Sequence, residues 1–470
     1  MELGIALPKG RLLAATADIL TRAGLEIDDY SDKARLYRLK SKLHPGLRAK
    51  IFQEKDIPIQ VATGNYDLGI CGLDWLEEQL VKFRSSDLVK LKNLGYGDGA
   101  VYAAVCDASY DGQTLTTRTP LVRIASEYPN LAEALAQRLR LKRFSVFPLW
   151  GAAEAYPPDN ADIILLSRKT EDELSCHGLA VLGKVVDFKA VLIANRCSLK
   201  EKDLSEFISA IGSVLPAGTQ GRVAAHEMDS IDINVDARSD DPAAVRLALP
   251  DGHQQAHVRK ILDAAGISVE DYPSASGNRS PQSGIGGVSI KVIRPQDMPL
   301  QVANGNFDIA ITGRDWLTDH KHQFPTSPVI ELMDLKYGWV RIVAVVDNTI
   351  PVNGRADLKP HCNQLGRPYR VASEYVNIAD NYARENQLGL YRIIPTWGAT
   401  EAFLPEDADM LIENTETGST IARHNLKIID TLFESTACVI GRQDAEAGEL
   451  KRGRIANFLS AMNKGVAALA

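Results

Sequence analysis

The sequence predicts an α/β protein that consists of two tandem halves, each built from two lobes. Three observations indicate this fold class. The chain has 470 residues, which is more than one domain of ordinary size. Short apolar runs alternate with helical stretches, as in α/β folds. Blocks from the first part of the chain occur again in the second part, which indicates an internal duplication.

The duplication is visible in five blocks that keep their order. DIPIQVA at 56–62 recurs as DMPLQVA at 297–303, GNYD at 64–67 as GNFD at 305–308, GLDWL at 72–76 as GRDWL at 313–317, RIASEY at 123–128 as RVASEY at 370–375, and WGAAE at 150–154 as WGATE at 397–401. The period is far longer than a solenoid repeat, so we interpret the chain as two homologous halves. We place the first half at 1–220 and the second at 245–470, with an Asp-rich linker at 221–244.

The elements expected within the first half follow from its apolar runs. We expect strands at Gly4–Leu7, Leu68–Cys71, Val101–Val105, Arg123–Ala125, Ile163–Leu166 and Val191–Ala194, and helices at Leu12–Ala23 and Asn130–Leu139. After Gly97 the chain enters a second set of strands and helices, and the run at Val191 can return to the first set. Each half is therefore expected to have two lobes with a ligand-binding cleft between them. The second half starts again with a strand at Val245–Leu249.

Composition and charge exclude several classes of function. Lys and Arg number 53 and Asp and Glu number 60, a net charge of −7, so we expect no broad positive surface for a nucleic acid. No run of about 18 apolar residues predicts a membrane span, and the first residues lack the pattern of a signal peptide. The 6 cysteines are scattered without a Cys-x-x-Cys pair, which favours a reducing compartment. We therefore expect a cytoplasmic protein.

A candidate anion site lies in the second half, where a strand around Glu413 leads into a small-residue turn and a helix start. Thr417, Ser419 and Thr420 offer hydroxyls, and Gly418 lets an anion approach the backbone closely. Glu413 can accept hydrogen bonds from the vicinal hydroxyls of a sugar. The alternative interpretation is an ordinary helix N-cap, in which the hydroxyls only satisfy the first backbone amides.

The first half provides an internal comparison for this turn, because Asp162 aligns with Asp409 without a gap. Its turn reads Thr-Glu-Asp-Glu at 170–173, and Leu166 stands at the position of Glu413. Three carboxylates would repel a phosphate by several kcal/mol in a partly desolvated site. We therefore expect the first half to have lost the anion site.

Cations show the opposite distribution between the halves. Lys9 and Arg11 lie on the first strand-to-helix turn of the first half, where they can bind phosphates. At the same positions, the second half has Asp251 and His253, whereas the arginines at 294 and 341 occur only in the second half. Any single arginine can simply be a solvated surface residue. The prediction of phosphate-binding cations therefore depends on these residues taken together.

These motifs resemble those of the ATP phosphoribosyltransferase family, which catalyses the first step of histidine biosynthesis. The residues that carry the resemblance are LPKGR at 7–11, RPQDMP at 294–299, GRD at 313–315, ASEY at 372–375, GATE at 398–401 and TGSTI at 417–421. The resemblance covers most of both halves and implies a two-lobed fold similar to type 2 periplasmic binding proteins. It also implies transfer of the phosphoribosyl group of phosphoribosyl pyrophosphate (PRPP) to N1 of ATP, with release of pyrophosphate.

The resemblance further implies roles for the candidate residues. The turn Thr417–Thr420 would hold the 5′-phosphate of PRPP, with Asp409 and Glu413 near its ribose. Arg341 completes the substrate-binding set. The catalytic set is Lys9, Arg11, Arg294 and Glu401, of which the three cations would meet the pyrophosphate or the ATP phosphates. Mg²⁺ would be the cofactor on the leaving pyrophosphate, and no residue is assigned as a metal ligand. Because adenine N1 attacks the sugar directly, no protein nucleophile is needed.

The duplicated core leaves two hypotheses open. In the first, the chain is an internal pseudo-dimer in which Lys9 and Arg11 reach the turn of the other half, giving one composite site for ATP and PRPP. A homo-oligomer of such pseudo-dimers and a regulatory subunit are further partners compatible with the resemblance. In the second, the protein is a non-catalytic regulatory paralogue that binds a nucleotide or an amino acid.

Overall fold

The computed structural model describes most of the chain. The described residues are 3–31, 37–41, 44–83, 87–106, 121–139, 141, 143–215, 243–275, 277–443 and 448–469. Most of the linker expected at 221–244 lies outside these residues, so the linker and the limits of the two halves remain predictions.

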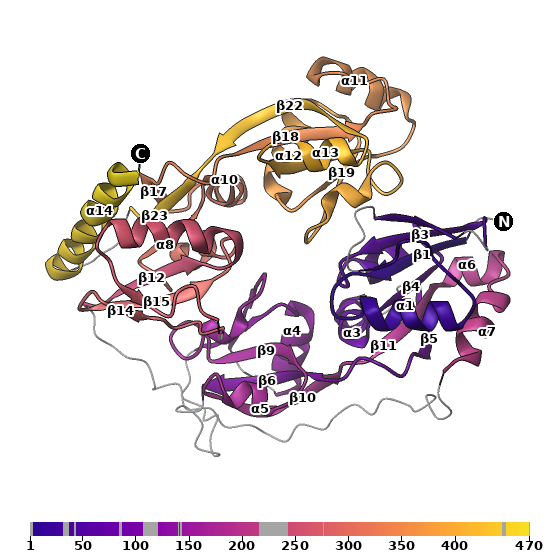
Figure 1. Ribbon diagram of the computed structural model, residues 1–470, viewed down its shortest axis with the longest axis horizontal. Helices are drawn as coiled ribbons and strands as arrows, with labels where there is room; N and C mark the ends of the chain where they lie inside the picture. The colour runs from indigo at the N-terminus through magenta and orange to yellow at the C-terminus, as the bar shows by residue number, and fades with distance from the viewer. Residues whose placement is uncertain are drawn as a thin grey trace. The chain divides into compact units, whose positions relative to one another are not determined.

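The first lobe of the first half is a mixed sheet with helices packed on it (Figure 1). Its elements are β1 (Leu3–Pro8), α1 (Leu13–Arg22), β2 (Arg38–Lys40), β3 (Leu47–Phe52), α2 (Ile57–Ala62), β4 (Leu68–Gly72), α3 (Leu73–Lys82), β5 (Leu88–Asn93), β11 (Ala190–Asn195), α6 (Arg196–Glu201) and α7 (Ser205–Ser213). The strand order is β2-β3-β1-β4-β11-β5. Strand β1 runs parallel to β3 and β4, whereas β11 runs antiparallel to β4 and β5.

The second lobe is inserted between β5 and β11. Its elements are β6 (Ala100–Cys106), β7 (Val122–Ser126), α4 (Pro129–Arg138), β8 (Phe144–Pro148), β9 (Ile163–Arg168), α5 (Asp172–Ser175) and β10 (Leu179–Asp187). The strand order is β10-β6-β9-β7-β8. The chain therefore leaves the first sheet after Gly97 and returns at Val191, as the apolar runs predict.

The second half repeats both lobes. Its first lobe contains β12 (Val245–Pro250), α8 (Gln255–Ala264), β13 (Val269–Glu270), β14 (Gln282–Ser283), β15 (Val288–Ile293), α9 (Met298–Ala303), β16 (Ile309–Gly313), α10 (Arg314–Gln323), β17 (Val329–Asp334), β23 (Ala437–Arg442) and α14 (Glu449–Leu469). Its second lobe contains β18 (Val340–Asp347), α11 (Arg355–Gln364), β19 (Tyr369–Ser373), α12 (Val376–Glu385), β20 (Tyr391–Pro395), β21 (Met410–Thr415), α13 (Ser419–Arg423) and β22 (Leu426–Ser435). The main sheets have the orders β15-β12-β16-β23-β17 and β22-β18-β21-β19-β20, which match the corresponding strands of the first half. The predicted α/β architecture with two tandem two-lobed halves is confirmed.

Apolar central strands explain why these sheets form. Ile5 and Leu7 of β1 and Ile70 of β4 have no exposed surface, as expected for strands covered on both faces. In the second half, α14 packs along α8 (Figure 1). Gly465 permits this close approach, because a Cβ atom there would lie 2.7 Å from the carbonyl oxygen of Ile261.

The chain forms two compact units, and each unit includes a segment of the other half. One unit comprises Met1–Pro148, Asp162–Asn234 and Thr396–Phe403, and the other comprises Leu149–Ala161, Val235–Pro395 and Leu404–Ala470. In the second unit, the backbone N–H of Trp150 donates to the Asp297 carboxylate at 3.2 Å. In the first unit, the rings of Phe403 and Phe52 pack edge to face, with centroids 5.4 Å apart. The compact units therefore differ from the halves expected at 1–220 and 245–470, because each exchanged segment packs on the other half.

Within the described ranges, none of the helices combines the length and the apolar character that a membrane crossing requires.

Candidate functional site

The predicted anion turn lies between β21 and α13, in the second lobe of the second half. Strand β21 ends at Thr415 and helix α13 begins at Ser419. Gly418 has φ +77°, a left-handed value that costs a non-glycine residue about 1 kcal/mol or more. Its N–H donates to Thr415 Oγ1 at 2.9 Å, which closes the turn. The strand, the tight turn and the helix start therefore occur where the sequence predicts them.

The anion-binding groups of this turn are exposed to solvent. Thr417, Ser419 and Thr420 are exposed. Thr417 Oγ1 accepts from the Ser419 N–H at 3.3 Å, as the N-cap alternative predicts. Within the described residues, however, the N–H groups of Thr420 and Ile421 have no acceptor, as is typical of the first turn of a helix. These amides and the neighbouring hydroxyls can donate together to an anion.

Arg341 lies beside the turn on the neighbouring strand. Strands β18 and β21 pair antiparallel, and Arg341 is directly opposite Thr415. In the part of the chain that the structure describes, the Arg341 guanidinium has no hydrogen-bond or ion-pair partner. An arginine in this state can bind a phosphate through two parallel hydrogen bonds.

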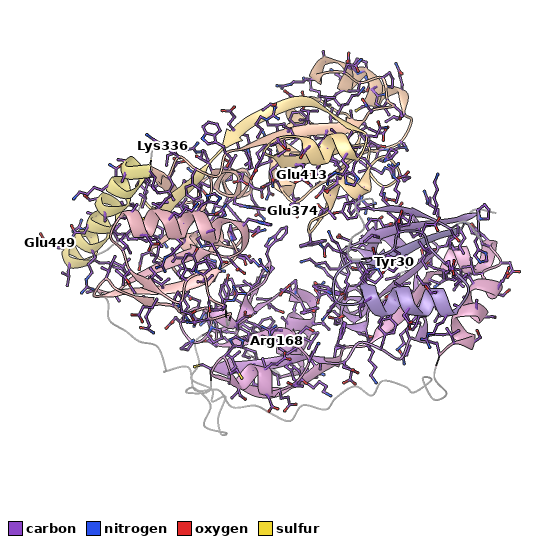
Figure 2. The ribbon with its side chains drawn as sticks, viewed as in Figure 1. Tyr30, Arg168, Lys336, Glu374, Glu413 and Glu449 are labelled. Carbon is purple, nitrogen blue, oxygen red and sulfur yellow. The ribbon has the colours of Figure 1, made fainter. Side chains whose placement is uncertain are left out.

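Glu413 lies two residues before Thr415 on β21 and is labelled in Figure 2. Its Oε1 accepts from the N–H of Asn414 at 3.1 Å. Among the described residues, no three His, Cys, Asp or Glu side chains gather as a metal site. Mg²⁺ often binds substrate phosphates with only one or two protein carboxylates, so an ion that arrives on the substrate remains a prediction without an assigned protein ligand.

The corresponding turn of the first half is acidic and has a different backbone. Strand β9 ends at Arg168, the counterpart of Thr415 (Figure 2), and α5 begins at Asp172. Glu171 stands at the position of Gly418 and has φ −68°, so the left-handed turn is absent there. Glu173 Oε2 accepts from the N–H of Lys169 at 3.4 Å, which adds a third carboxylate to the turn. This geometry agrees with the prediction that the first half lacks the anion site.

A buried aspartate and a tyrosine join the two lobes within each half. Tyr128 donates its hydroxyl hydrogen to Asp74 at 2.7 Å, and Tyr375 donates to Asp315 at 2.5 Å. Burial raises the pKa of Tyr128 and Tyr375 far above the usual range, so both hydroxyls stay protonated. This contact was not predicted from the sequence, although its residues belong to the repeated GxDWL and ASEY blocks. The aspartate and the tyrosine occur at matching positions in both halves, and this repetition was the signal that could have indicated the contact.

A second carboxylate reinforces each lobe contact. Glu78 accepts from the backbone N–H groups of Asn130 and Leu131 at 2.8 Å, at the start of α4. In the second half, Asp319 accepts in the same way from the start of α12, at 2.9 Å. Burial is the main cause that raises the pKa of Glu78, to about 7, although the two backbone hydrogen bonds oppose this shift.

Comparison with known proteins identifies the family. Residues 53–213 and 294–464 match the family model of HisG, ATP phosphoribosyltransferase. The chain belongs to this family. Because the model matches two successive segments, the HisG core occurs twice in the chain, as the repeated blocks predict.

Individual members of the HisG family align with about half of this chain. ATP phosphoribosyltransferase of Chlorobaculum parvum is 30% identical over 224 residues, which are 46% of this chain and 69% of the relative. The Saccharolobus solfataricus protein of the same name is 32% identical over 236 residues, 48% of this chain and 72% of the relative. In a solved structure of an ATP phosphoribosyl transferase (HisG:HisZ) complex from Thermotoga maritima, one chain is 22% identical, with a TM-score of 0.38. That alignment covers 48% of this chain and 99% of the other.

Asp409, which the HisG resemblance places near the ribose, lies away from the turn. It directly precedes β21, at the opposite end of that strand, and lies six positions before Thr415, about 20 Å along an extended strand. Arg367 binds its two carboxylate oxygens at 2.7 Å, and the Arg370 N–H donates at 2.8 Å. Burial alone would raise the pKa of Asp409, but these hydrogen bonds lower it below its usual value. Asp162 binds Arg123 in the same way at 2.9 Å, so this aspartate pairs with arginine in both halves, and the place of Asp409 near the ribose remains a prediction.

Arg11 is bound by two acidic side chains of the first half. Its guanidinium donates to Glu54 at 3.1 Å, to Asp74 at 2.8 Å and to Ser167 Oγ at 2.9 Å. It also lies over the ring of Phe188, 3.6 Å from the centroid. The two carboxylates compensate the charge of Arg11 in this structure, and its contact with pyrophosphate remains a prediction.

Lys9 is exposed, like Arg11, but the two residues have different partners. Its Nζ donates to Tyr37 Oη at 3.2 Å and lies 5.0 Å from the centre of that ring. No carboxylate of the described residues is paired with Lys9, so its predicted contact with phosphates remains a prediction.

Arg294 and Glu401 lie outside the lobe that carries the turn. Arg294 belongs to the first lobe of the second half, where its Nη1 is 3.4 Å from the Asp251 carboxylate. Its Nε is buried without a partner among the described residues. Glu401 stands in a short helix (Thr400–Phe403) that belongs to the other compact unit. Their catalytic roles remain predictions.

Arg279 was not predicted from the sequence. Its guanidinium forms ion pairs with Asp251 at 2.8 Å and with Glu154 at 2.9 Å.

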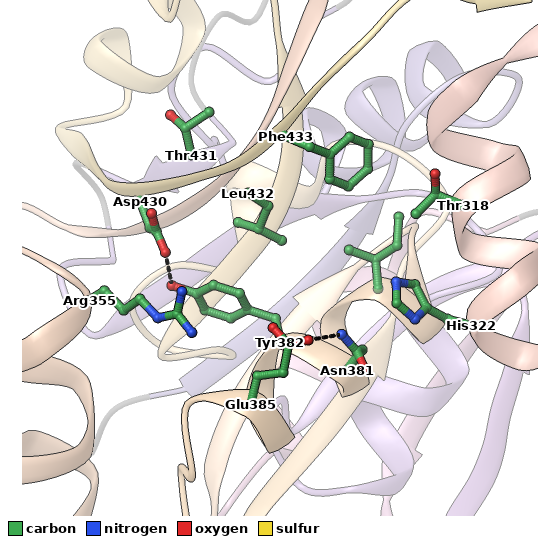
Figure 3. Close-up of a pocket in the computed structure, with 11 residues that line it drawn as sticks. Thr318, His322, Arg355, Asn381, Tyr382, Glu385, Asp430, Thr431, Leu432 and Phe433 are labelled. Atoms are coloured by element: carbon green, nitrogen blue, oxygen red, sulfur yellow. Dashed lines mark hydrogen bonds between the residues drawn. The ribbon is translucent and has the colours of Figure 1, made fainter.

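A pocket of about 240 Å³ lies elsewhere in the second half, between α10, α12 and β22 (Figure 3). Tyr382 donates to Asp430 at 2.9 Å at its edge, and Arg355 lines the same side. The first half has Leu135 and Gly183 at the positions of this tyrosine and aspartate, so the polar pair is specific to the second half. None of the predicted site residues lines this pocket.

Proposed function

We propose that the protein is an ATP phosphoribosyltransferase that transfers the phosphoribosyl group of PRPP to N1 of ATP and releases pyrophosphate, the first step of histidine biosynthesis. Membership in the HisG family supports this reaction. We further propose that the second half alone binds PRPP, with the 5′-phosphate at the turn Thr417–Thr420.

The contrast between the two turns carries this proposal. In the second half, Gly418 in a left-handed conformation, two open amides and three hydroxyls form a turn that suits a phosphate. In the first half, Glu171 replaces the glycine and two further acids follow it. A phosphate at about 5 Å from one such carboxylate is repelled by about 1 to 3 kcal/mol, depending on the local dielectric. One half is therefore suited to a sugar phosphate and the other is not.

The reaction needs positioning and charge stabilisation rather than a protein nucleophile. The bond between the anomeric carbon and the pyrophosphate oxygen breaks, and its electron pair leaves with pyrophosphate. The lone pair of adenine N1 forms the new bond to the anomeric carbon. The turn would hold the 5′-phosphate, Glu413 would orient the ribose hydroxyls, and Arg341 would pair with phosphate charge.

The remaining components of this proposal follow from the family and the charge of the substrates. Mg²⁺ would enter with the pyrophosphate group and neutralise part of its charge. Lys9, Arg11, Arg294 and Glu401 stay candidates for the catalytic set, and a composite site shared by the two halves remains part of the hypothesis. We expect a cytoplasmic enzyme, since all six cysteines are free thiols. A homo-oligomer and a regulatory subunit are proposed as further partners.

The test is pyrophosphate release from the purified full-length chain. We expect release only when ATP, PRPP and Mg²⁺ are all present. Thr417→Ala should lower the affinity for PRPP, whereas Thr170→Ala, the matched change in the first half, should not. Pyrophosphate release that is independent of ATP, or an equal effect of both variants, would contradict the proposal.

The second candidate is a non-catalytic regulatory paralogue that binds a nucleotide or an amino acid. The binding of Arg11 by Glu54 and Asp74 favours it, because this removes one predicted catalytic cation. Such a protein would bind its ligand without releasing pyrophosphate under any combination of the three components.

A further inference from the structure

A chain of hydrogen bonds connects the two lobes of the second half. Tyr375 precedes α12 in the second lobe, and its hydroxyl donates to Asp315 Oδ2 at the start of α10 in the first lobe, at 2.5 Å. Ser435 Oγ donates to the other oxygen of Asp315 at 2.9 Å. Tyr375 is 1% exposed and Asp315 is 6% exposed. Water therefore cannot replace either partner without a change in packing.

The same tyrosine also holds the strand that leads into the anion turn. Asn414 Nδ2 donates to Tyr375 Oη at 2.8 Å. The next residue, Thr415, accepts from the N–H of Gly418 through its Oγ1. The hydroxyl of Tyr375 thus accepts from the turn side and donates to the aspartate of the other lobe, so each bond fixes the direction of the other.

The first half keeps the lobe contact but not the connection to a turn. Tyr128 donates to Asp74 as Tyr375 donates to Asp315. The counterpart of Asn414 is Ser167, and its hydroxyl accepts from Arg11 at 2.9 Å. In the first half, Ser167 therefore contacts Arg11 of the other lobe.

We propose that Tyr375 is a positioning residue for the sugar-phosphate turn, acting through Asn414, so that the affinity of the turn for PRPP depends on the contact of Tyr375 with Asp315. This inference rests on the proposed function. Hydrogen-bonding groups that bind a phosphate must be held within about 0.5 Å of their productive positions. Loss of the Tyr375 hydroxyl leaves the Asn414 amide without its acceptor, so the end of β21 and the turn lose this restraint.

The test compares Tyr375→Phe with Tyr128→Phe, because each variant removes the hydroxyl that donates to a buried aspartate. Binding of PRPP and of ribose 5-phosphate is measured by titration calorimetry on the full chain, together with thermal unfolding. We expect both variants to lower the melting temperature similarly. Only Tyr375→Phe should weaken binding of both ligands, by about tenfold, and it should raise KM for PRPP more than it lowers kcat.

Asn414→Ser provides a milder variant, because it introduces the first-half residue at an exposed position. We expect it to weaken PRPP binding with little loss of stability, and to add no further loss in the Tyr375→Phe background. Unchanged PRPP affinity in Tyr375→Phe or Asn414→Ser, beside a wild-type protein that binds PRPP, overturns the inference. A wild-type protein that binds neither ligand overturns the proposed function, and this inference with it.

Discussion

Arg11 and Asp74 form an ion pair of 2.8 Å in which the aspartate side chain is fully buried. Asp74 also accepts the hydroxyl hydrogen of Tyr128, and Arg11 reaches Ser167 in the second lobe. Arg11 therefore links the two lobes of the first half. At the equivalent position, the second half has the exposed His253, so this link is specific to the first half.

We predict that Arg11→Ala destabilises the protein, because it leaves the buried carboxylate of Asp74 without its cation. The loss should be about 1 to 3 kcal/mol, since the arginine itself is partly exposed. Urea unfolding measures this loss, and His253→Ala serves as the control with little expected change. A variant with unchanged stability and a large decrease in kcat would instead support the catalytic role that the motif suggested.

We predict that Ser419→Asp, which introduces the acid of the first-half turn, weakens PRPP binding. Coulomb repulsion between the new carboxylate and the 5′-phosphate should cost about 1 to 3 kcal/mol. The effect should decrease at high salt, because the turn is exposed. Calorimetric titration with PRPP measures it, and Asp172→Ser in the first half is the matched control. Equal affinities for the Ser419→Asp variant and the wild type would place the phosphate elsewhere.

We predict that Asp409→Asn and Asp162→Asn both lower the stability of the protein and leave the affinity for PRPP unchanged. Each substitution removes a carboxylate that binds one or two arginines at the edge of a lobe, a loss of about 1 to 3 kcal/mol. Since Asp409 is remote from the turn, neither variant should change the affinity for PRPP. Unfolding curves and PRPP titration test this pair, and a selective loss of PRPP binding in Asp409→Asn would restore its predicted role at the ribose.

We predict that the first half becomes less stable as the pH rises from about 5 to 8. The pKa of Glu78 is raised from 4.5 to about 7 in the folded protein, mainly by burial. A raised carboxyl pKa contributes stability that is complete below about 4.5 and is lost as the pH rises through about 7. The loss amounts to about 3 kcal/mol at most. Urea midpoints across this range measure it, and Glu78→Gln should reduce the dependence. An unchanged slope in that variant would assign the effect to other groups.

Much of the fold could be predicted from the sequence, because the apolar runs and the repeats are strong signals. Strands β1, β4 and β12 lie within one residue of the expected runs, and the crossing points at Gly97 and Val191 are confirmed. The exchange of segments could not be predicted. Trp150 and Asp297 are far apart in sequence, and no periodicity indicates that they contact each other.

The candidate site was only partly predictable for a similar reason. The turn at 417–420 is local, so glycine and hydroxyl residues in order were sufficient to locate it. The partners of Arg11 and Asp409 depend on tertiary contacts: Glu54 and Asp74 in one case, Arg367 and Arg370 in the other. A motif indicates which charged residues are present, but not which oppositely charged residues pair with them in the folded protein.

The segments that each compact unit takes from the other half make the two copies mutually necessary. Cleaving the gene at the linker would separate Trp150 from Asp297 and Phe403 from Phe52, so neither product would carry its complete fold. The half with the acidic turn therefore still contributes Leu149–Ala161 to the compact unit that carries the anion turn.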